Sequence, residues 1–148
     1  GFHGHIVINS IGVITTGTFI AANIDERDVC PELADKITGL LLGDKGFIRP
    51  ALKQGLAKQG VYLETPLRDN MCDERPKSFS KWLVSTRRLV ETVIGQLSER
   101  FHIEKVRARD FWHQTSRFWR KLLAHTACIV LNIKLGNEPL QFESLITH

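Results

Sequence analysis

Two carboxylates in this sequence could bind a metal ion, and one arginine lies close to the second of them in the sequence. Asp44 follows the apolar run LLL at 40–42 with a single glycine between, and Glu91 lies in RRLVETVIGQL, four residues after Arg87. Carboxylate oxygens are hard ligands that suit Mg²⁺ or Mn²⁺. Each residue also has an ordinary interpretation. Asp44 could be a turn aspartate, and Arg87 with Glu91 could form a surface ion pair one helical turn apart.

The segments around Asp44 predict an α/β fold. Two runs rich in β-branched residues, HIVINS and VITTGTFIAA, predict a hairpin over 5–22. The segment 31–39 predicts a short helix that starts at Pro31, and 40–42 predicts a strand buried on both faces. A second helix is expected from Pro50 to Gly60, followed by a strand at 61–65. This order of elements predicts a mixed sheet with helices packed on it, which would place Asp44 at a sheet edge.

Two long helices are expected in the second half, after a polar connector at 66–80. The first, about 80–101, has an apolar face at helical spacing: Leu83, Val90, Val93, Ile94, Leu97 and Phe101. Glu91 directly follows Val90 and therefore borders this face. The second, about 109–135, is expected as one helix or a bent pair that ends before Gly136. Its inner side is predicted to carry Trp112, Trp119, Leu122, Ile129 and Ile133.

Composition and charge limit the classes of protein to consider. The 148 residues predict a single domain, and no apolar stretch is long enough to cross a bilayer. Three separated cysteines with no CxxC motif suit a reducing compartment. The net charge is +4, and seven Lys/Arg lie between Arg100 and Lys121, interleaved with aromatic residues. Such a stretch suits a polyanion such as nucleic acid, but a solvated helix face over a buried aromatic stripe has the same pattern.

The order of these motifs resembles the DDE transposases of bacterial insertion sequences. The resemblance is carried by GFHGHIVINSIGVITTGTFIAANIDERDV, then LLLGDKGF, then RRLVETVIGQL. Asp44 to Phe47 matches the D-K-G-Y/F turn of the family, and Arg87 with Glu91 matches its R-x-x-x-E helix. The segment from Phe101 to Asn132 resembles the end of the family's domain, so that the likeness covers about residues 1–135.

The resemblance implies an RNase H-like fold, a mixed sheet flanked by helices. In that fold the first of three catalytic carboxylates lies on a strand before GFHGHIVIN, so we expect residues 1–148 to form an N-terminally truncated, partial domain. Four positions depart from the family's pattern: His3, Asn9, Val84 and Ser98 stand where the family has Lys, Asp, Tyr and Lys. These differences concern the binding of element ends rather than Asp44 or Glu91.

The implied activity is DNA cleavage and strand transfer for an insertion sequence, with Mg²⁺ or Mn²⁺ as cofactor. Asp44 and Glu91 would hold the metal, and Arg87 would orient Glu91 or contact a phosphate. The residues expected to neutralise DNA phosphates are Lys45, Arg87, Arg88, Arg107 and Arg109. Since the first carboxylate is not in this sequence, we expect weak metal binding and little turnover from the chain alone.

The same resemblance predicts partners and a location. DNA is the expected partner, both as element ends and as target, and the intact protein is expected to form a homo-oligomer in the bacterial cytoplasm, at the nucleoid when acting on DNA. Two alternatives remain open at this point. The chain could be a catalytically inactive remnant that binds only DNA or a partner, or an RNase H-like nuclease with another substrate.

Overall fold

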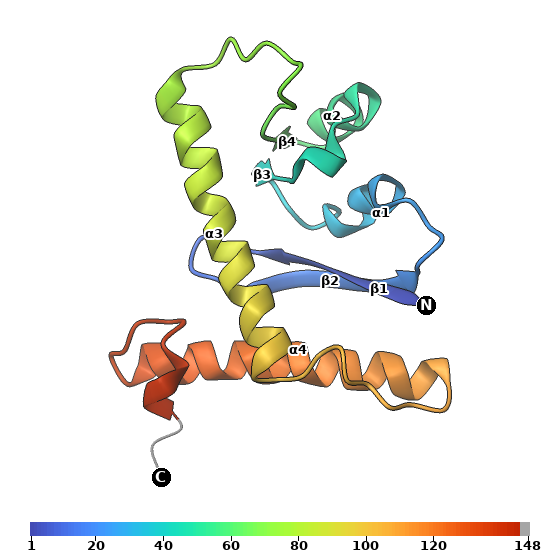
Figure 1. Cartoon of the computed structure of the whole chain (residues 1–148), viewed down its shortest axis with the longest axis vertical. Coiled ribbons are helices and arrows are strands. Elements are labelled where there is room, and N and C mark those ends of the chain that lie inside the picture. Colours follow the sequence, from blue (N-terminus) through green and yellow to red (C-terminus); the bar gives the residue numbers. More distant parts are fainter. Residues whose placement is uncertain (146–148) are drawn as a thin grey trace. The chain divides into compact units, whose positions relative to one another are not determined.

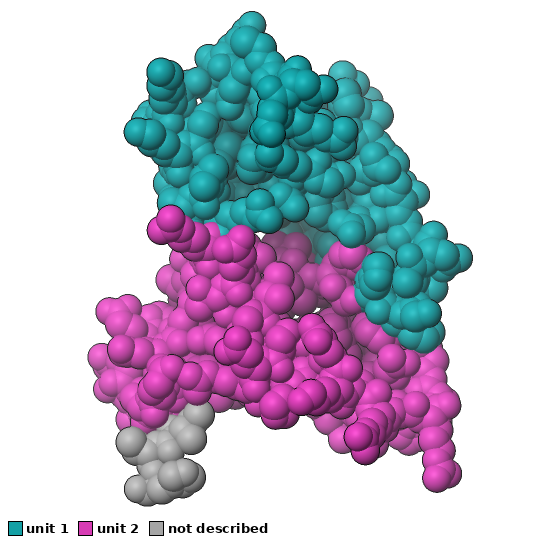
Figure 2. Space-filling view, in the orientation of Figure 1, with its two compact units in different colours: residues 1–3, 20–87 teal, residues 4–19, 88–148 magenta. Residues whose placement is uncertain are grey.

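The computed structural model of the chain describes residues 1–145 (Figure 1). The chain is divided into two compact units, shown in different colours in Figure 2. Unit 1 comprises residues 1–3 and 20–87, and unit 2 comprises 4–19 and 88–145. The chain passes from one unit to the other between residues 3 and 4, between residues 19 and 20, and within one long helix between Arg87 and Arg88.

Unit 1 is built on two parallel strands. β3 (Gly39–Leu42) and β4 (Val61–Glu64) pair in the register that sets Gly39 opposite Val61 and Leu42 opposite Glu64. The other elements of the unit are α1 (Glu26–Leu33), the 3₁₀ turn η1 (Lys45–Phe47), α2 (Pro50–Ala57) and the first part of α3 (Lys77–Glu99). Its core consists of Cys30, Ala34, Leu52, Leu56, Val61 and Leu63, with Leu41 and Phe47 packed against them.

Proline and glycine explain two of these boundaries. Pro50 is the first residue of α2, where its missing N–H costs nothing, and Gly60 has a φ of 79° where the chain turns into β4. The helix and the strand predicted at 50–60 and 61–65 are therefore confirmed.

The helix predicted at 31–39 is wrong in position, because α1 begins earlier. Asp25 caps it by accepting a hydrogen bond from the Arg27 backbone N–H, and Pro31 lies inside the helix.

Unit 2 combines most of a hairpin with two helices. The strands β1 (Phe2–Ile8) and β2 (Ile14–Ala21) confirm the predicted hairpin. The rest of α3, the single helix α4 (Phe111–Lys134) and the 3₁₀ turn η2 (Phe142–Leu145) complete the unit. Its core consists of Val93, Leu97, Phe118 and Leu122, with seven partly buried residues around them: Ile6, Ile8, Ile14, Phe19, Phe101, Ile103 and Leu140.

Three expectations about packing are wrong. The described strands form two separate two-stranded sheets rather than one mixed sheet. β3 is not buried on both faces, because β4 is its only neighbour among the described strands and Leu40 is 50% exposed. In α3, Val90 and Ile94 are exposed while Leu83, Val93 and Leu97 are buried. The predicted apolar face of α3 was thus too wide.

The buried side of α4 also differs from the prediction. Trp112, Trp119 and Ile133 are exposed, whereas Leu122 and Ile129 are buried as expected. The buried positions recur at alternating spacings of four and three: Phe118, Leu122, His125, Ile129 and Asn132. His125 and Asn132 are polar, so a pattern of apolar residues alone does not predict that they are buried. No helix within residues 1–145 has the length and apolar character to cross a membrane.

Candidate metal and nucleic-acid site

Asp44 lies at the carboxyl-terminal edge of the parallel pair β3 and β4. The Gly43 N–H donates to the carbonyl of Glu64 at 3.0 Å, which extends the pairing up to the residue before Asp44. The Asp44 carbonyl accepts from the Phe47 N–H at 2.9 Å, but the Asp44 side chain makes no capping hydrogen bond in η1. The carboxylate is 56% exposed and is not used to build the turn. It therefore remains available to a ligand.

The turn that carries Asp44 is packed tightly against the core of unit 1. A Cβ added to Gly43 would lie 3.3 Å from the Phe47 Cβ and from the Leu63 Cδ1. Phe47 itself packs on the buried cluster of the unit. Glycine at position 43 thus lets the chain pass between β4 and the ring that anchors the turn, so that Asp44 follows a well-packed segment.

Arg87 is the cation that faces Asp44. Its Nη1 lies 3.4 Å from the Asp44 Oδ1, and both side chains are about half exposed. The sequence pattern linked Arg87 only with Glu91, one helical turn further along α3, and missed its contact with Asp44. An ion pair this exposed adds little to stability, about 1 kcal/mol or less. Its importance is positional, because Arg87 brings a guanidinium to the edge where a metal or a phosphate could bind.

A second carboxylate at this edge, Glu64, was not predicted and is already neutralised. Glu64 ends β4 beside Leu42 of β3. Its Oε1 is 2.9 Å from the Lys53 Nζ, and its Oε2 is 2.9 Å from the Arg75 Nη1. Two cations thus occupy both oxygens, and we assign Glu64 a structural role. Within residues 1–145, no group of three or more His, Cys, Asp or Glu side chains is placed to hold a metal ion.

The connector predicted at 66–80 is tied down by charged groups. Arg75 contacts Asp73 at 2.8 Å as well as Glu64, and the Ser80 hydroxyl donates to Asp73 at 2.9 Å. The hydrogen bonds from Arg75 hold the pKa of the Asp73 carboxyl well below its usual range. Lys45, predicted to bind phosphate, lies 3.4 Å from Asp69 of the same connector. A phosphate would have to compete with Asp69 for this ammonium group.

The basic residues of unit 2 fall into two groups. Arg88, Arg107 and Arg109 are exposed, as phosphate ligands must be. Three other cations of the 100–121 stretch serve the unit itself: Arg100 pairs with Glu143, Arg117 donates to the Arg107 carbonyl, and Lys121 donates to the His102 carbonyl. Partial burial lowers the pKa of Lys121. Only part of the basic stretch is therefore free for a polyanion.

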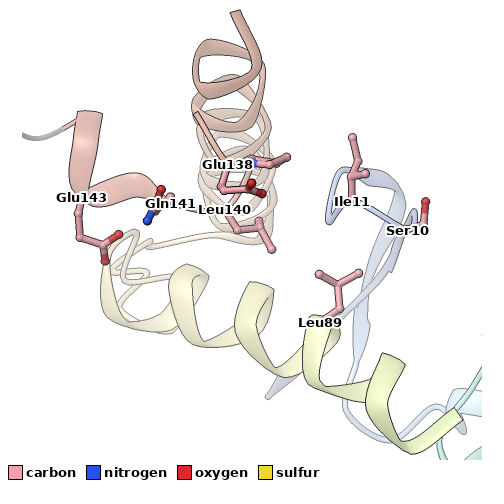
Figure 3. Close-up of a pocket in the computed structure, with 8 residues that line it drawn as sticks. Ser10, Ile11, Leu89, Glu138, Leu140, Gln141 and Glu143 are labelled. Carbon is pink, nitrogen blue, oxygen red and sulfur yellow. The ribbon is translucent and has the colours of Figure 1, made fainter. Parts of the chain in front are cut away.

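A shallow groove of about 480 Å³ also lies in unit 2 (Figure 3). Ile11 of the hairpin turn, Leu89 of α3 and Leu140 point toward it from three segments. Glu138 and Glu143 line its rim, but none of the predicted metal or phosphate ligands does.

Comparison with known protein families decides the affiliation. The family model described as transposase DDE domain matches residues 1–111. The chain belongs to this family. The matched part of this transposase DDE domain includes Asp44, Arg87 and Glu91, and it ends at the first residue of α4. The resemblance noted in the sequence is thereby confirmed at the level of the family. No curated protein and no solved structure matches the chain.

Proposed function

We propose that the protein is a DNA transposase domain of an insertion sequence, of RNase H-like type, that acts on DNA through a divalent-metal site. The family match supports this proposal. The observation that carries the site is the position of Asp44: an exposed carboxylate directly after β3, at the edge of a parallel strand pair, with Arg87 of α3 beside it. Carboxyl ends of parallel strands are where α/β proteins place their ligands.

The donor chemistry fits a hard divalent cation. Asp44 and Glu91 would hold Mg²⁺ or Mn²⁺, since both are exposed carboxylates and such cations prefer oxygen ligands. When bound, the metal would polarise the scissile phosphate and lower the pKa of an attacking water or hydroxyl group. The guanidinium of Arg87 would hold Asp44 while the metal is absent and orient a DNA phosphate when DNA is bound.

The basic residues would supply the rest of the DNA contact. Arg88, Arg107 and Arg109 are exposed and would neutralise phosphates, which makes binding depend on salt concentration. Lys45 would join them on exchanging its contact with Asp69 for a phosphate. Each contact of this kind contributes a slope of about −0.9 to the dependence of log affinity on log salt concentration.

The proposal is tested by DNA binding in the presence and absence of a divalent cation. A fluorescent duplex is titrated with the chain in Ca²⁺, Mn²⁺ or chelator, and anisotropy gives the affinity. We expect the cation to strengthen binding by the wild type and to have no effect on Asp44→Asn or Glu91→Gln. Asp35→Asn and Glu99→Gln are matched controls, because both carboxylates are exposed and neither forms an ion pair with another described side chain.

Two results would contradict the proposal. Absence of DNA binding under all conditions would exclude a DNA-acting domain. Cation-independent binding that is equal in the wild type and in both site variants would favour the inactive, DNA-binding remnant. Any Mg²⁺-dependent nicking of a supercoiled plasmid should disappear in Asp44→Asn and in Glu91→Gln, and nicking that survives either change would overturn the assignment of that residue.

A further inference from the structure

Arg49 joins the segment that follows Asp44 to the first turn of α1. Its Nη1 donates to the Asp28 Oδ1 at 2.8 Å, and its Nη2 lies 3.3 Å from the Asp25 Oδ2. Arg49 is the residue just before α2, two positions after the end of η1. One guanidinium thus connects the chain leaving the Asp44 turn with two carboxylates of another helix.

Asp25 is a rigid attachment point for this guanidinium. Its Oδ1 accepts from the Arg27 backbone N–H at 2.9 Å as the cap of α1, and the Arg27 guanidinium binds both of its oxygens. The side-chain hydrogen bonds from Arg27, with help from the charge of Arg49, hold the pKa of the Asp25 carboxyl well below its usual range. The carboxylate therefore stays ionised and fixed in direction.

Other contacts hold the Asp44 turn on its remaining sides, among them the ion pairs of Asp44 with Arg87 and of Lys45 with Asp69. On its strand side the Gly43 N–H binds Glu64, and in its centre Phe47 packs into the core. Gly46 has no side chain to contact α1, although the position of its missing Cβ would lie 3.9 Å from the Glu26 carboxylate. Phe47 packs on a cluster that includes Cys30 of α1, so η1 already lies against this helix, and Arg49 adds two directional, charged contacts to the first turn of α1.

We propose that Arg49 is a positioning residue for Asp44: by bridging Asp25 and Asp28, it fixes the 3₁₀ turn so that the Asp44 carboxylate is held ready for a divalent cation. This inference rests on the metal-binding role proposed for Asp44. Arg49 acts through the backbone of the turn and touches neither metal nor DNA. Lysine is a poor substitute, because one ammonium group cannot reach both carboxylates in the fork geometry of a guanidinium.

The chain offers a matched control. Arg27 and Arg49 both bind Asp25, but Arg27 lies within α1 and has no link to η1. Arg27→Gln therefore removes an equal charge and a contact with the same carboxylate, and leaves the bridge from Arg49 to Asp28 in place. Arg49→Gln removes the bridge, and Arg49→Lys keeps the charge as a variant that should fold if Arg49→Gln does not.

Hydrogen exchange and Mn²⁺ binding provide two independent measurements. The first follows the N–H groups of Phe47 and Ile48, which bond to Asp44 and Lys45 within the turn. We expect exchange to be about threefold faster or more in Arg49→Gln, and less accelerated in Arg49→Lys and in Arg27→Gln, since Arg27→Gln loosens Asp25 but leaves the bond from Arg49 to Asp28 in place. The second is the Mn²⁺ dissociation constant from electron paramagnetic resonance, which should rise by a similar factor in Arg49→Gln and by less in Arg27→Gln.

The outcomes separate the two proposals. Exchange that is unaltered in Arg49→Gln, or equally faster in Arg27→Gln, would overturn the positioning role whatever the metal does. Faster exchange with an unchanged Mn²⁺ dissociation constant would overturn it too, because the turn would then move without affecting its carboxylate. Failure of the wild type to bind Mn²⁺ at all would instead refute the proposed metal site, while the exchange data would still decide whether Arg49 holds the turn.

Discussion

His125 should make unit 2 sensitive to acid. Its side chain is 0% exposed and packs between Phe101 and Phe142, with ring centroids 5.7 and 5.0 Å away. The ring Nε2 is 2.9 Å from the Gln96 Oε1, and Gln96 uses its amide N–H to bind the Leu140 carbonyl. The Nε2 must therefore donate, which leaves the Nδ1 as the buried, unprotonated nitrogen with no hydrogen-bond partner.

The size of the effect follows from the pKa. Burial lowers the pKa of His125 from 6.5 to about 4, because a proton on Nδ1 would place a charge in an apolar site. An unfolded chain takes up this proton below about pH 6.5, whereas the folded one resists it until about pH 4. The unfolding free energy is thus fully retained above about pH 6.5 and falls on acidification toward pH 4. The loss from this residue is about 3 kcal/mol, at about 1.4 kcal/mol per pKa unit.

Urea unfolding at several pH values tests this expectation against His125→Gln, which cannot titrate but can still donate to Gln96. Between about pH 7 and about pH 4.5, the wild type should lose about 2 to 3 kcal/mol more than the variant. Since the other titrating groups are the same in both proteins, the difference isolates His125. Equal losses in the two proteins, or a pKa near 6.5 for His125 by nuclear magnetic resonance, would show that burial does not keep His125 neutral.

Four further substitutions have outcomes that follow from packing or hydrogen bonding, each measured as the change in unfolding free energy. Gly43→Ala should lower the unfolding free energy by about 1 to 3 kcal/mol, because its Cβ would meet packed side chains at 3.3 Å. Gly55→Ala has open space around it in α2 and should raise the unfolding free energy by about 0.5 to 1 kcal/mol. Equal effects of the two substitutions would contradict this expectation. Gly4→Ala should also cost about 1 to 3 kcal/mol, because its Cβ would overlap the buried Phe118 ring, and a neutral result would exclude that contact. Asn132→Ala should lower the unfolding free energy by about 2 to 3 kcal/mol, since the Asn132 amide donates at 3.1 Å to two carbonyls of the segment after α4. A decrease below about 0.5 kcal/mol would mean that water replaces the amide there.

Features governed by local chemistry could be predicted from the sequence. Pro50 and Gly60 mark the start of α2 and the turn into β4, and Gly136 follows α4 with a φ of 75°. The β-branched runs mark the hairpin, and helical spacing marks α3 and α4. The start of α1 is also local, but Asp25 as a cap competed with the stronger signal of Pro31. The helix was therefore predicted to begin at Pro31, later in the sequence than it does.

Features that depend on distant contacts could not be predicted. Which strands pair is decided by tertiary packing, and the expected mixed sheet is replaced by two separate pairs. His125 and Asn132 are polar residues that the sequence offers no reason to bury until their partners, Gln96 and the segment after α4, are known. The contact of Arg87 with Asp44 is of the same kind. The motifs identified both residues, but only the structure brings them together.

The proposal that Asp44 and Glu91 bind the same divalent cation can be tested by paramagnetic broadening with Mn²⁺. The amide resonances around Asp44 in η1 and around Glu91 in α3 are followed in the wild type and in Asp44→Asn. We expect Mn²⁺ to broaden both sets in the wild type and Asp44→Asn to remove the broadening from both. Broadening of neither set, or broadening around Glu91 that persists unchanged in Asp44→Asn, would contradict a shared metal site.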